Sequence, residues 1–134
     1  MGSDKNVLDR YFKAAKKYNA DTIIRITADC PFADPKLIQE MLKFFKNHKF
    51  DYISNTIYPT YPDGLDVEIF SFKALYKCWK NAKSFYDREH VTSYIRTSKN
   101  FNIHNMILYN TVKNGVVFIL FLAIVFYFIF KFDN

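Results

Sequence analysis

The side chain best placed for chemistry is the Asp29 carboxylate. It follows a β-branched run, Thr22 to Thr27, that has the length of a buried strand. A carboxylate at the carboxyl end of a strand could hold Mg²⁺ through one or two oxygens while the phosphates of a nucleotide complete the coordination. From the spacing alone, a loop aspartate that caps a turn is an equal alternative.

Further polar side chains could contact a substrate, and we take six of them as candidates: Asp63, Asp66, Glu68, Arg88, Glu89 and His90. Asp63 also begins an ordinary turn pair with glycine, and Asp66 and Glu68 share one face of an alternating run that could simply face solvent. Glu89 could cap its own helix, and His90 could titrate near neutral pH or lie satisfied in a core. Spacing leaves both interpretations open for each group.

Periodicity indicates the elements that must position these residues. Apolar residues at three- and four-residue spacing predict helices over residues 4–18, 35–47, 72–83 and 87–97. β-branched or alternating runs predict strands over residues 22–27, 50–54 and 65–70. Asp34 is placed to cap the second helix ahead of Pro35, and Ser71 to cap the third. This alternation favours an α/β fold, a mostly parallel sheet with helices on both faces and sites at the carboxyl ends of its strands.

Composition narrows the class of partner. The chain has 134 residues and a formal net charge of +6, and its lysines are spread along the predicted helix faces. Such a spread is typical of solvated surface, so we expect no nucleic-acid partner, although it would suit nucleotides, sugar acids or anionic lipid. Cys30 and Cys78 form no CxxC pair and have no ligand at metal-site spacing, which indicates a reduced, cytoplasmic setting.

The sequence changes character near its C-terminus, and we divide it into a partial domain at residues 1–109 and a hydrophobic tail at residues 110–134. Val116 to Phe130 is an uninterrupted apolar run, which predicts a single transmembrane helix at about residues 115–132. Lys113 and Lys131 could extend this short span by snorkelling. A buried core segment and the product of a frameshift are the alternatives. Without an apolar leader, the domain is expected to stay in the cytoplasm, anchored by this helix or else soluble.

Four segments resemble those of one family, in the same order. Arg25-Ile-Thr-Ala-Asp-Cys-Pro31, read on to Pro35, resembles an RITGDCPLIDP-type segment of the cytidylyltransferases, in the spore-coat polysaccharide branch related to the acylneuraminate and Kdo enzymes. The other three resemble the family's NVLDRY, YPDGLDVE and REHVT segments and lie at residues 6–11, 61–68 and 88–92. Together the matches extend over residues 2–101.

The resemblance implies a Rossmann-like fold of the nucleotide-diphospho-sugar transferase type, which joins CTP to a sugar acid and releases pyrophosphate. Asp29 would then be the catalytic aspartate that binds Mg²⁺, and catalysis would rest on positioning and charge neutralisation. Residues 63–68 would border the sugar pocket, and residues 88–90 would form a second polar group. A homodimer would be in keeping with the family.

The sequence also departs from the family pattern. Its glycines are Gly2, Gly64 and Gly115, so it has no glycine-rich phosphate loop, which in the family precedes the NVLDRY segment. A late VDTPEDL-like segment with a second metal-binding aspartate has no counterpart either, and the similarity ends after about residue 105. We therefore expect a fragment truncated at its N-terminus that binds CTP poorly alone and exposes an unpaired sheet edge.

Two functions remain in view. The first is a fragment of a nucleotidyltransferase that transfers CMP from CTP to a sugar acid in polysaccharide or glycan biosynthesis, incomplete or inactive alone. The second is a membrane-tethered, non-catalytic module whose lysine-rich domain docks on anionic lipid or on a partner in polysaccharide synthesis.

Overall fold

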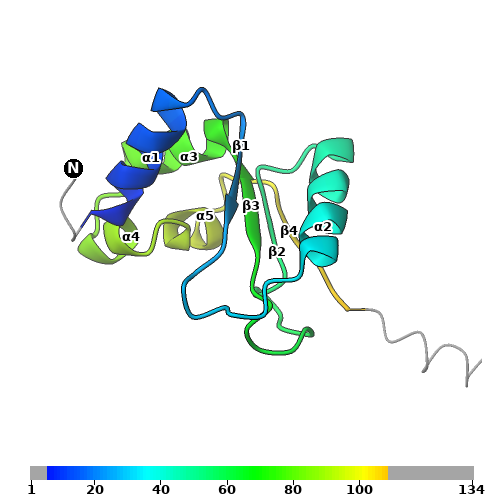
Figure 1. Cartoon of the computed structure of the whole chain (residues 1–134). Helices are drawn as coiled ribbons and strands as arrows, with labels where there is room; N and C mark the ends of the chain where they lie inside the picture. Colours follow the sequence, from blue (N-terminus) through cyan, green and yellow to red (C-terminus); the bar gives the residue numbers. More distant parts are fainter. Residues whose placement is uncertain (1–5, 109–134) are drawn as a thin grey trace, which may run out of the picture.

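Helices cover both faces of a small sheet (Figure 1). The computed structural model describes residues 6–108. Its elements follow the chain as α1 (Val7–Lys17), β1 (Thr22–Arg25), α2 (Pro35–Asn47), β2 (Tyr52–Ser54), β3 (Glu68–Ser71), α3 (Phe72–Asn81), α4 (Phe85–Glu89), α5 (Ser93–Thr97) and β4 (Ile103–Asn105). In Figure 1, α2 lies on one side of the strands and the other four helices lie on the opposite side.

The sheet is mixed. Its four strands lie in the order β1-β3-β2-β4, with β3 antiparallel to both neighbours and β4 parallel to β2. The prediction of a mostly parallel sheet is therefore wrong for β3. The segment between β2 and β3 contains no helix, so it cannot make the helical crossover that usually joins parallel strands. The strand β4 was not predicted, because its three residues are too few for a periodic pattern.

Alternate residues of β2 and β3 divide the interior into two cores. Tyr52 and Phe70 belong to the larger core beneath α1, α3 and α5, whereas Ile53 and Ile69 pack under α2. All four side chains are fully buried. The period of two along each strand therefore gives both faces of the sheet an apolar layer, and helices on both faces are confirmed.

Side-chain caps begin the longer helices where the sequence predicts. The Asp34 carboxylate accepts a hydrogen bond from the Lys36 amide at 2.9 Å, with proline in the first turn, and the Ser71 hydroxyl accepts from the Ala74 amide at 3.0 Å. Each cap satisfies one of the amides that lack a partner within the helix. These two predictions, and the extent of α2 to Asn47, are confirmed.

The single helix predicted over residues 87–97 is wrong. The segment forms α4 and α5, separated by a tight turn in which Val91 has a φ of +51°. Left-handed backbone is unfavourable for a β-branched residue, and Val91 is nevertheless fully buried. A hydrogen bond spans the turn, since Asp87 in α4 accepts from the hydroxyl of Ser93 in α5 at 2.6 Å. Asp87 also accepts from the Ser84 hydroxyl, at the start of α4, at 2.6 Å.

The predicted C-terminal transmembrane helix lies outside the described residues. Within residues 6–108, no helix is long and apolar enough to cross a membrane.

Candidate functional site

The loop after β1 displays the Asp29 carboxylate. A turn closes where the Cys30 amide donates to the Thr27 carbonyl at 3.1 Å, and the Thr27 hydroxyl lies 3.2 Å from the Cys30 sulfur. Asp29 itself is exposed. A hydrogen bond from the Thr27 side chain, helped by the loop backbone, lowers the pKa of Asp29. The carboxylate is therefore ionised and open to a cation at neutral pH.

A glycine turn brings the second predicted segment against this loop. Gly64 has a φ of +86°, and a Cβ added there would stand 2.9 Å from the Phe32 ring. Only glycine tolerates both the backbone conformation and this close approach. The turn at residues 61–64 thus packs directly on the segment that follows Asp29.

The electrostatics of Asp66 reflect how close the two loops lie. Burial raises the pKa of Asp66, and the negative charges of Asp63, Asp29 and Glu68 raise it further. Like charges act this way only when they are close. The structure therefore gathers four of the predicted site residues, which lie in two segments of the sequence.

Glu68 is the centre of a buried hydrogen-bond network. Its Oε1 accepts from the Tyr52 hydroxyl at 2.7 Å and from the Thr92 hydroxyl at 2.6 Å, while its Oε2 pairs with the Arg25 guanidinium. Burial, followed by the charge of Glu68, raises the pKa of Tyr52, which keeps the donating proton in place. The interpretation of Glu68 as part of a solvated strand face is therefore wrong, since only 5% of the residue is exposed.

A polar cavity of about 200 Å³ opens beside this network, and six residues line it: Arg25, Thr27, Thr56, Asp66, Glu68 and Arg96. Arg25 Nε is buried without a hydrogen-bond partner in the part of the chain that the structure describes. A buried donor of this kind is costly unless an acceptor reaches it. The cavity thus combines two guanidinium groups, two carboxylates and two hydroxyls, a set that suits a ligand rich in hydroxyl and anionic oxygens.

The predicted group at residues 88–90 has different surroundings. The Arg88 guanidinium donates to the Trp79 carbonyl at 2.7 Å. This bond satisfies a carbonyl in the last turn of α3, where carbonyls lack a partner within the helix. Glu89 and His90 are exposed, and the His90 ring lies 4.2 Å from the ring of Tyr86, measured between centroids. Within residues 6–108, none of these three residues lines the polar cavity, so their substrate-binding role stays a prediction. Thr92 is the residue of this segment that reaches Glu68.

Sequence reasoning missed several residues of the site. Tyr52 lies in β2, whereas Thr92 precedes α5 and Arg96 lies within it, so the three residues meet only through the fold. Arg25 lies in the segment that resembles the family's RITGDCPLIDP motif, but the β-branched run around it predicts only a strand residue. A hydroxyl or tyrosine in an apolar run carries no local sign that it will meet a buried carboxylate.

The predicted cofactor, Mg²⁺, stays a prediction, and the residues of the site can be compared with what this ion needs. Within residues 6–108, no three His, Cys, Asp or Glu side chains are arranged to hold a metal ion by themselves. The exposed, ionised Asp29 instead fits the usual coordination of Mg²⁺, in which one or two carboxylates bind the ion and phosphate and water complete its shell. The negative charges around Asp66 would favour a cation nearby.

Comparison with known proteins gives consistent matches. A family model described as Cytidylyltransferase matches residues 1–121. An uncharacterized protein of Methanocaldococcus jannaschii is 46% identical over 101 residues, which are 74% of this chain and 40% of that protein. Spore coat polysaccharide biosynthesis protein SpsF of Bacillus subtilis is 35% identical over 98 residues, which are 71% of this chain and 39% of that protein.

One solved structure also resembles the chain. A cytidylyltransferase from Leptospira borgpetersenii serovar Hardjo-bovis matches with a TM-score of 0.76 at 32% sequence identity. The match covers 80% of this chain and 46% of that one. The chain thus spans about two fifths of the length of the curated relatives that it matches.

Proposed function

This chain belongs to the cytidylyltransferase family, and from that premise we propose that its domain serves the transfer of CMP from CTP to a sugar acid in the synthesis of a surface polysaccharide. The observation that carries the proposal is the Gly64 turn against Phe32, because it joins the Asp29 loop to the acidic segment at residues 63–68. The name of the Bacillus relative supports the polysaccharide context.

In the proposed reaction, a sugar hydroxyl attacks the α-phosphorus of CTP and pyrophosphate leaves. Asp29 would hold Mg²⁺, which when bound neutralises phosphate charge. Asp66 is suited to accept the proton of the attacking hydroxyl, because burial and the neighbouring negative charges raise its pKa. The Arg25 and Arg96 guanidinium groups would orient the anionic and hydroxyl oxygens of the sugar acid.

The remaining contacts to CTP would come from a part of the family fold that residues 6–108 do not contain. The sequence has no glycine-rich phosphate loop, and the chain covers 46% of the solved cytidylyltransferase. Activity of the described domain by itself would therefore be low. The family also suggests a homodimer, and analytical ultracentrifugation would test that separate proposal.

Pyrophosphate release tests the proposal. We expect release that requires both CTP and Mg²⁺, measured with sugar acids as acceptors, and a loss of at least about 100-fold in Asp29→Ala. The matched control is Glu40→Ala, which removes an exposed carboxylate from α2 and should leave the rate unchanged. Equal rates for Asp29→Ala and wild type, or no release from folded protein supplied with the rest of the fold, would contradict the catalytic proposal.

A second candidate function is a membrane-tethered, non-catalytic module. It is favoured by the apolar run from Val116 to Phe130, which lies outside the described residues. On this proposal the domain stays in the cytoplasm beside anionic lipid. Full-length protein should pellet with vesicles and a variant that ends at residue 108 should not. A full-length chain that stays in the supernatant would exclude the tether.

A further inference from the structure

Asn55 is buried beside the acidic site, although it lies in none of the four segments that resemble the family. It follows β2 directly and is only 2% exposed. Its backbone amide donates to the Val67 carbonyl at 3.4 Å, which continues the pairing of β2 and β3 by one residue. A buried side-chain amide is costly unless its atoms are bonded, and the partners of this one are backbone groups of the acidic segment.

The Asn55 side chain bonds to the backbone on both sides of Asp66. Its Nδ2 donates to the Leu65 carbonyl at 2.8 Å, and its Oδ1 accepts from the Val67 amide at 2.9 Å. The Leu65 carbonyl belongs to the peptide group before Asp66, and the Val67 amide belongs to the peptide group after it. Because each peptide group is planar, holding both of them restricts the two backbone dihedral angles of Asp66. Asn55 therefore sets the direction in which the Asp66 side chain leaves the backbone.

The Asp66 carboxylate depends on this backbone for its position. It lines the polar cavity, and within residues 6–108 no hydrogen bond holds it there. Burial raises its pKa, and the like charges of Asp63, Asp29 and Glu68 raise it further, so repulsion favours its movement toward water. A carboxylate in such surroundings stays in place only if the backbone that carries it is held.

Other contacts anchor the same loop at different points. The Gly64 turn rests on Phe32. Asn105 in β4 bonds both backbone groups of Tyr58, at 3.0 Å to the amide and 3.1 Å to the carbonyl. Asn105 thus makes the same kind of contact as Asn55, in the same loop, but not at the peptide groups that flank Asp66.

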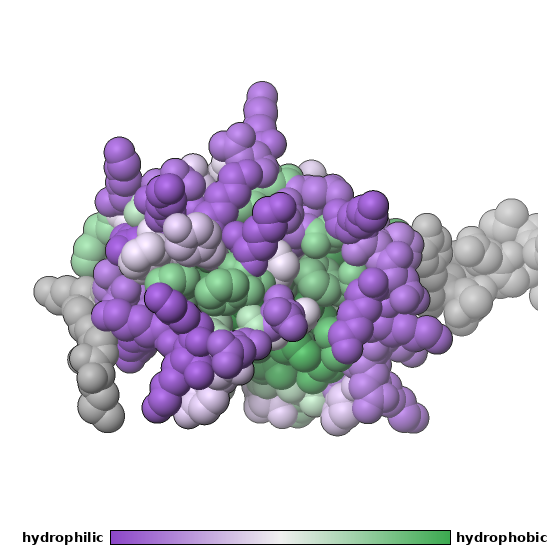
Figure 2. All heavy atoms as spheres, turned by 90° about the horizontal axis from the view of Figure 1, so that it is seen from above, coloured by the Kyte–Doolittle hydropathy of each residue, from purple (hydrophilic) through white to green (hydrophobic). Residues whose placement is uncertain are grey.

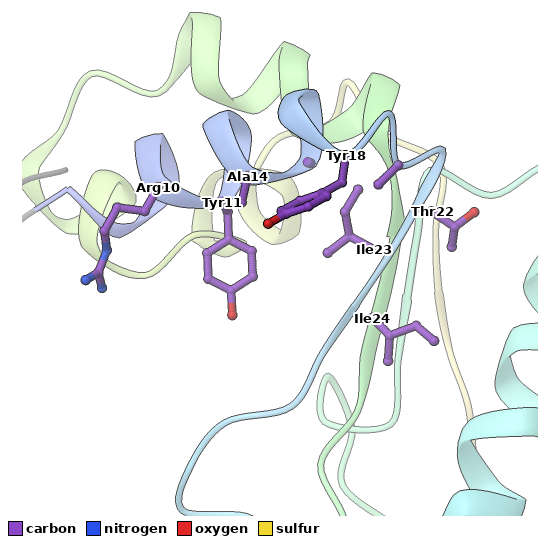
Figure 3. Close-up of a pocket in the computed structure, with 9 residues that line it drawn as sticks. Arg10, Tyr11, Ala14, Tyr18, Thr22, Ile23 and Ile24 are labelled. Atoms are coloured by element: carbon purple, nitrogen blue, oxygen red, sulfur yellow. The ribbon is translucent and has the colours of Figure 1, made fainter. Parts of the chain in front are cut away.

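A larger, apolar hollow lies away from this loop, between α1 and β1. It holds about 500 Å³, and Figure 3 shows Tyr18 and Ile23 side by side in its wall. The acidic loops lie at the lower end of the sheet in Figure 1, and Figure 2, seen from above, shows apolar surface between rows of hydrophilic side chains at the opposite end. The hollow shares no lining residue with the polar cavity, so a substitution there controls for general effects on the fold.

We propose that Asn55 is a positioning residue that holds the Asp66 carboxylate where it meets the acceptor hydroxyl. The inference rests on the proposed function, in which Asp66 accepts the proton of that hydroxyl. In this step the proton moves to Asp66, the hydroxyl oxygen bonds to the α-phosphorus of CTP, and the bond from that phosphorus to pyrophosphate breaks. A displacement of about 1 Å in a reacting group can cost about 100-fold in rate, so Asn55 acts on the rate through Asp66.

The pyrophosphate assay compares Asn55→Ala with two controls, Asn105→Ala and Tyr18→Ala. We expect kcat to fall about 100-fold in Asn55→Ala, with the KM for CTP changed by less than about 3-fold, and to stay within about 2-fold of wild type in both controls. In the Asp66→Asn background, Asn55→Ala should lower kcat by less than about 3-fold, because the base that Asn55 positions is gone. An equal loss in both backgrounds would show that Asn55 only supports the fold.

Carbon NMR of labelled aspartate examines the same site without turnover. The pKa of Asp66 should fall toward the ordinary aspartate value of about 3.9 in Asn55→Ala, because the carboxylate leaves its buried position beside like charges. It should stay unchanged in Asn105→Ala. If alanine prevents folding, Asn55→Ser replaces it, since the shorter hydroxyl cannot span both peptide groups.

Two results would overturn the proposal. One is a pKa of Asp66 equal to that of wild type in a folded Asn55 variant, and the other is failure of both Asn55 variants to fold. The pKa also separates this proposal from the proposed function. A fall in the pKa of Asp66 in Asn55→Ala, in a protein whose wild type releases no pyrophosphate, would support the positioning of Asp66 and count against the catalytic proposal alone.

Discussion

Removing the Thr92 hydroxyl should destabilise the fold far more than its size suggests. Thr92→Val keeps the shape of the side chain but deletes the donor that lies 2.6 Å from Glu68 Oε1. Both residues are buried, at 3% and 5% exposure, so water cannot replace the bond. A hydrogen bond to a charged group contributes about 1.5–3 kcal/mol, which is the destabilisation that we expect.

Urea unfolding followed by the fluorescence of Trp79, the chain's single tryptophan, measures this change. Trp79 stacks on Phe12 with ring centroids 4.3 Å apart, so unfolding alters its surroundings. With a slope of about 1.5 kcal/mol per molar urea, the midpoint should fall by about 1–2 M. The control is Thr97→Val, which removes an exposed hydroxyl and should change stability by less than about 0.5 kcal/mol.

A double mutant tests whether the network acts as a unit. Tyr52 and Thr92 donate to the same oxygen of Glu68, so Tyr52→Phe combined with Thr92→Val should differ from the sum of the two single changes by about 0.5 kcal/mol or more. A midpoint for Thr92→Val equal to that of the control, or strictly additive effects, would refute the interpretation of Glu68 as a buried carboxylate held by shared donors.

Two more changes are predictable from the structure. Gly64→Ala should destabilise the fold by about 1–3 kcal/mol, measured by the same unfolding assay, because the added Cβ meets Phe32 and the φ is positive; stability equal to wild type would show that the turn does not pack there. Hydrogen bonds from Lys13 and Trp79 lower the pKa of Asp9, so its contribution to stability is present above about pH 4 and is lost as the pH falls through the lower pKa of the folded state. The difference in unfolding free energy between wild type and Asp9→Asn should therefore shrink from pH 7 to about pH 3, and a constant difference would contradict this assignment.

Local features of the sequence predicted much of the fold. The caps at Asp34 and Ser71 act within a few residues, and the apolar spacing of α1 to α3 reports directly which face is buried. These features depend on neighbours in the chain, which is why they can be read without the fold. The Asp29 loop was placed correctly for the same reason, because it follows a strand.

Long-range contacts determine the features of the fold that could not be predicted from the sequence. The direction of β3 depends on which strands it pairs with, and no pattern within residues 65–70 indicates those partners. The break at Val91 runs against local preference and accompanies the contact between Thr92 and Glu68. The polar cavity likewise needs Arg25, Glu68 and Arg96 from three elements, so its lining appeared only in the fold.

The central claim is that the Asp29 loop and the segment at residues 63–68 form one acidic site. The pKa of the Asp66 carboxyl, measured by carbon NMR of labelled aspartate, tests it most directly. We predict a value above the ordinary aspartate value of about 3.9, and a lower one in Asp29→Asn, because that change removes a nearby negative charge. A pKa of Asp66 at or below the ordinary value, unmoved by Asp29→Asn, would contradict the claim.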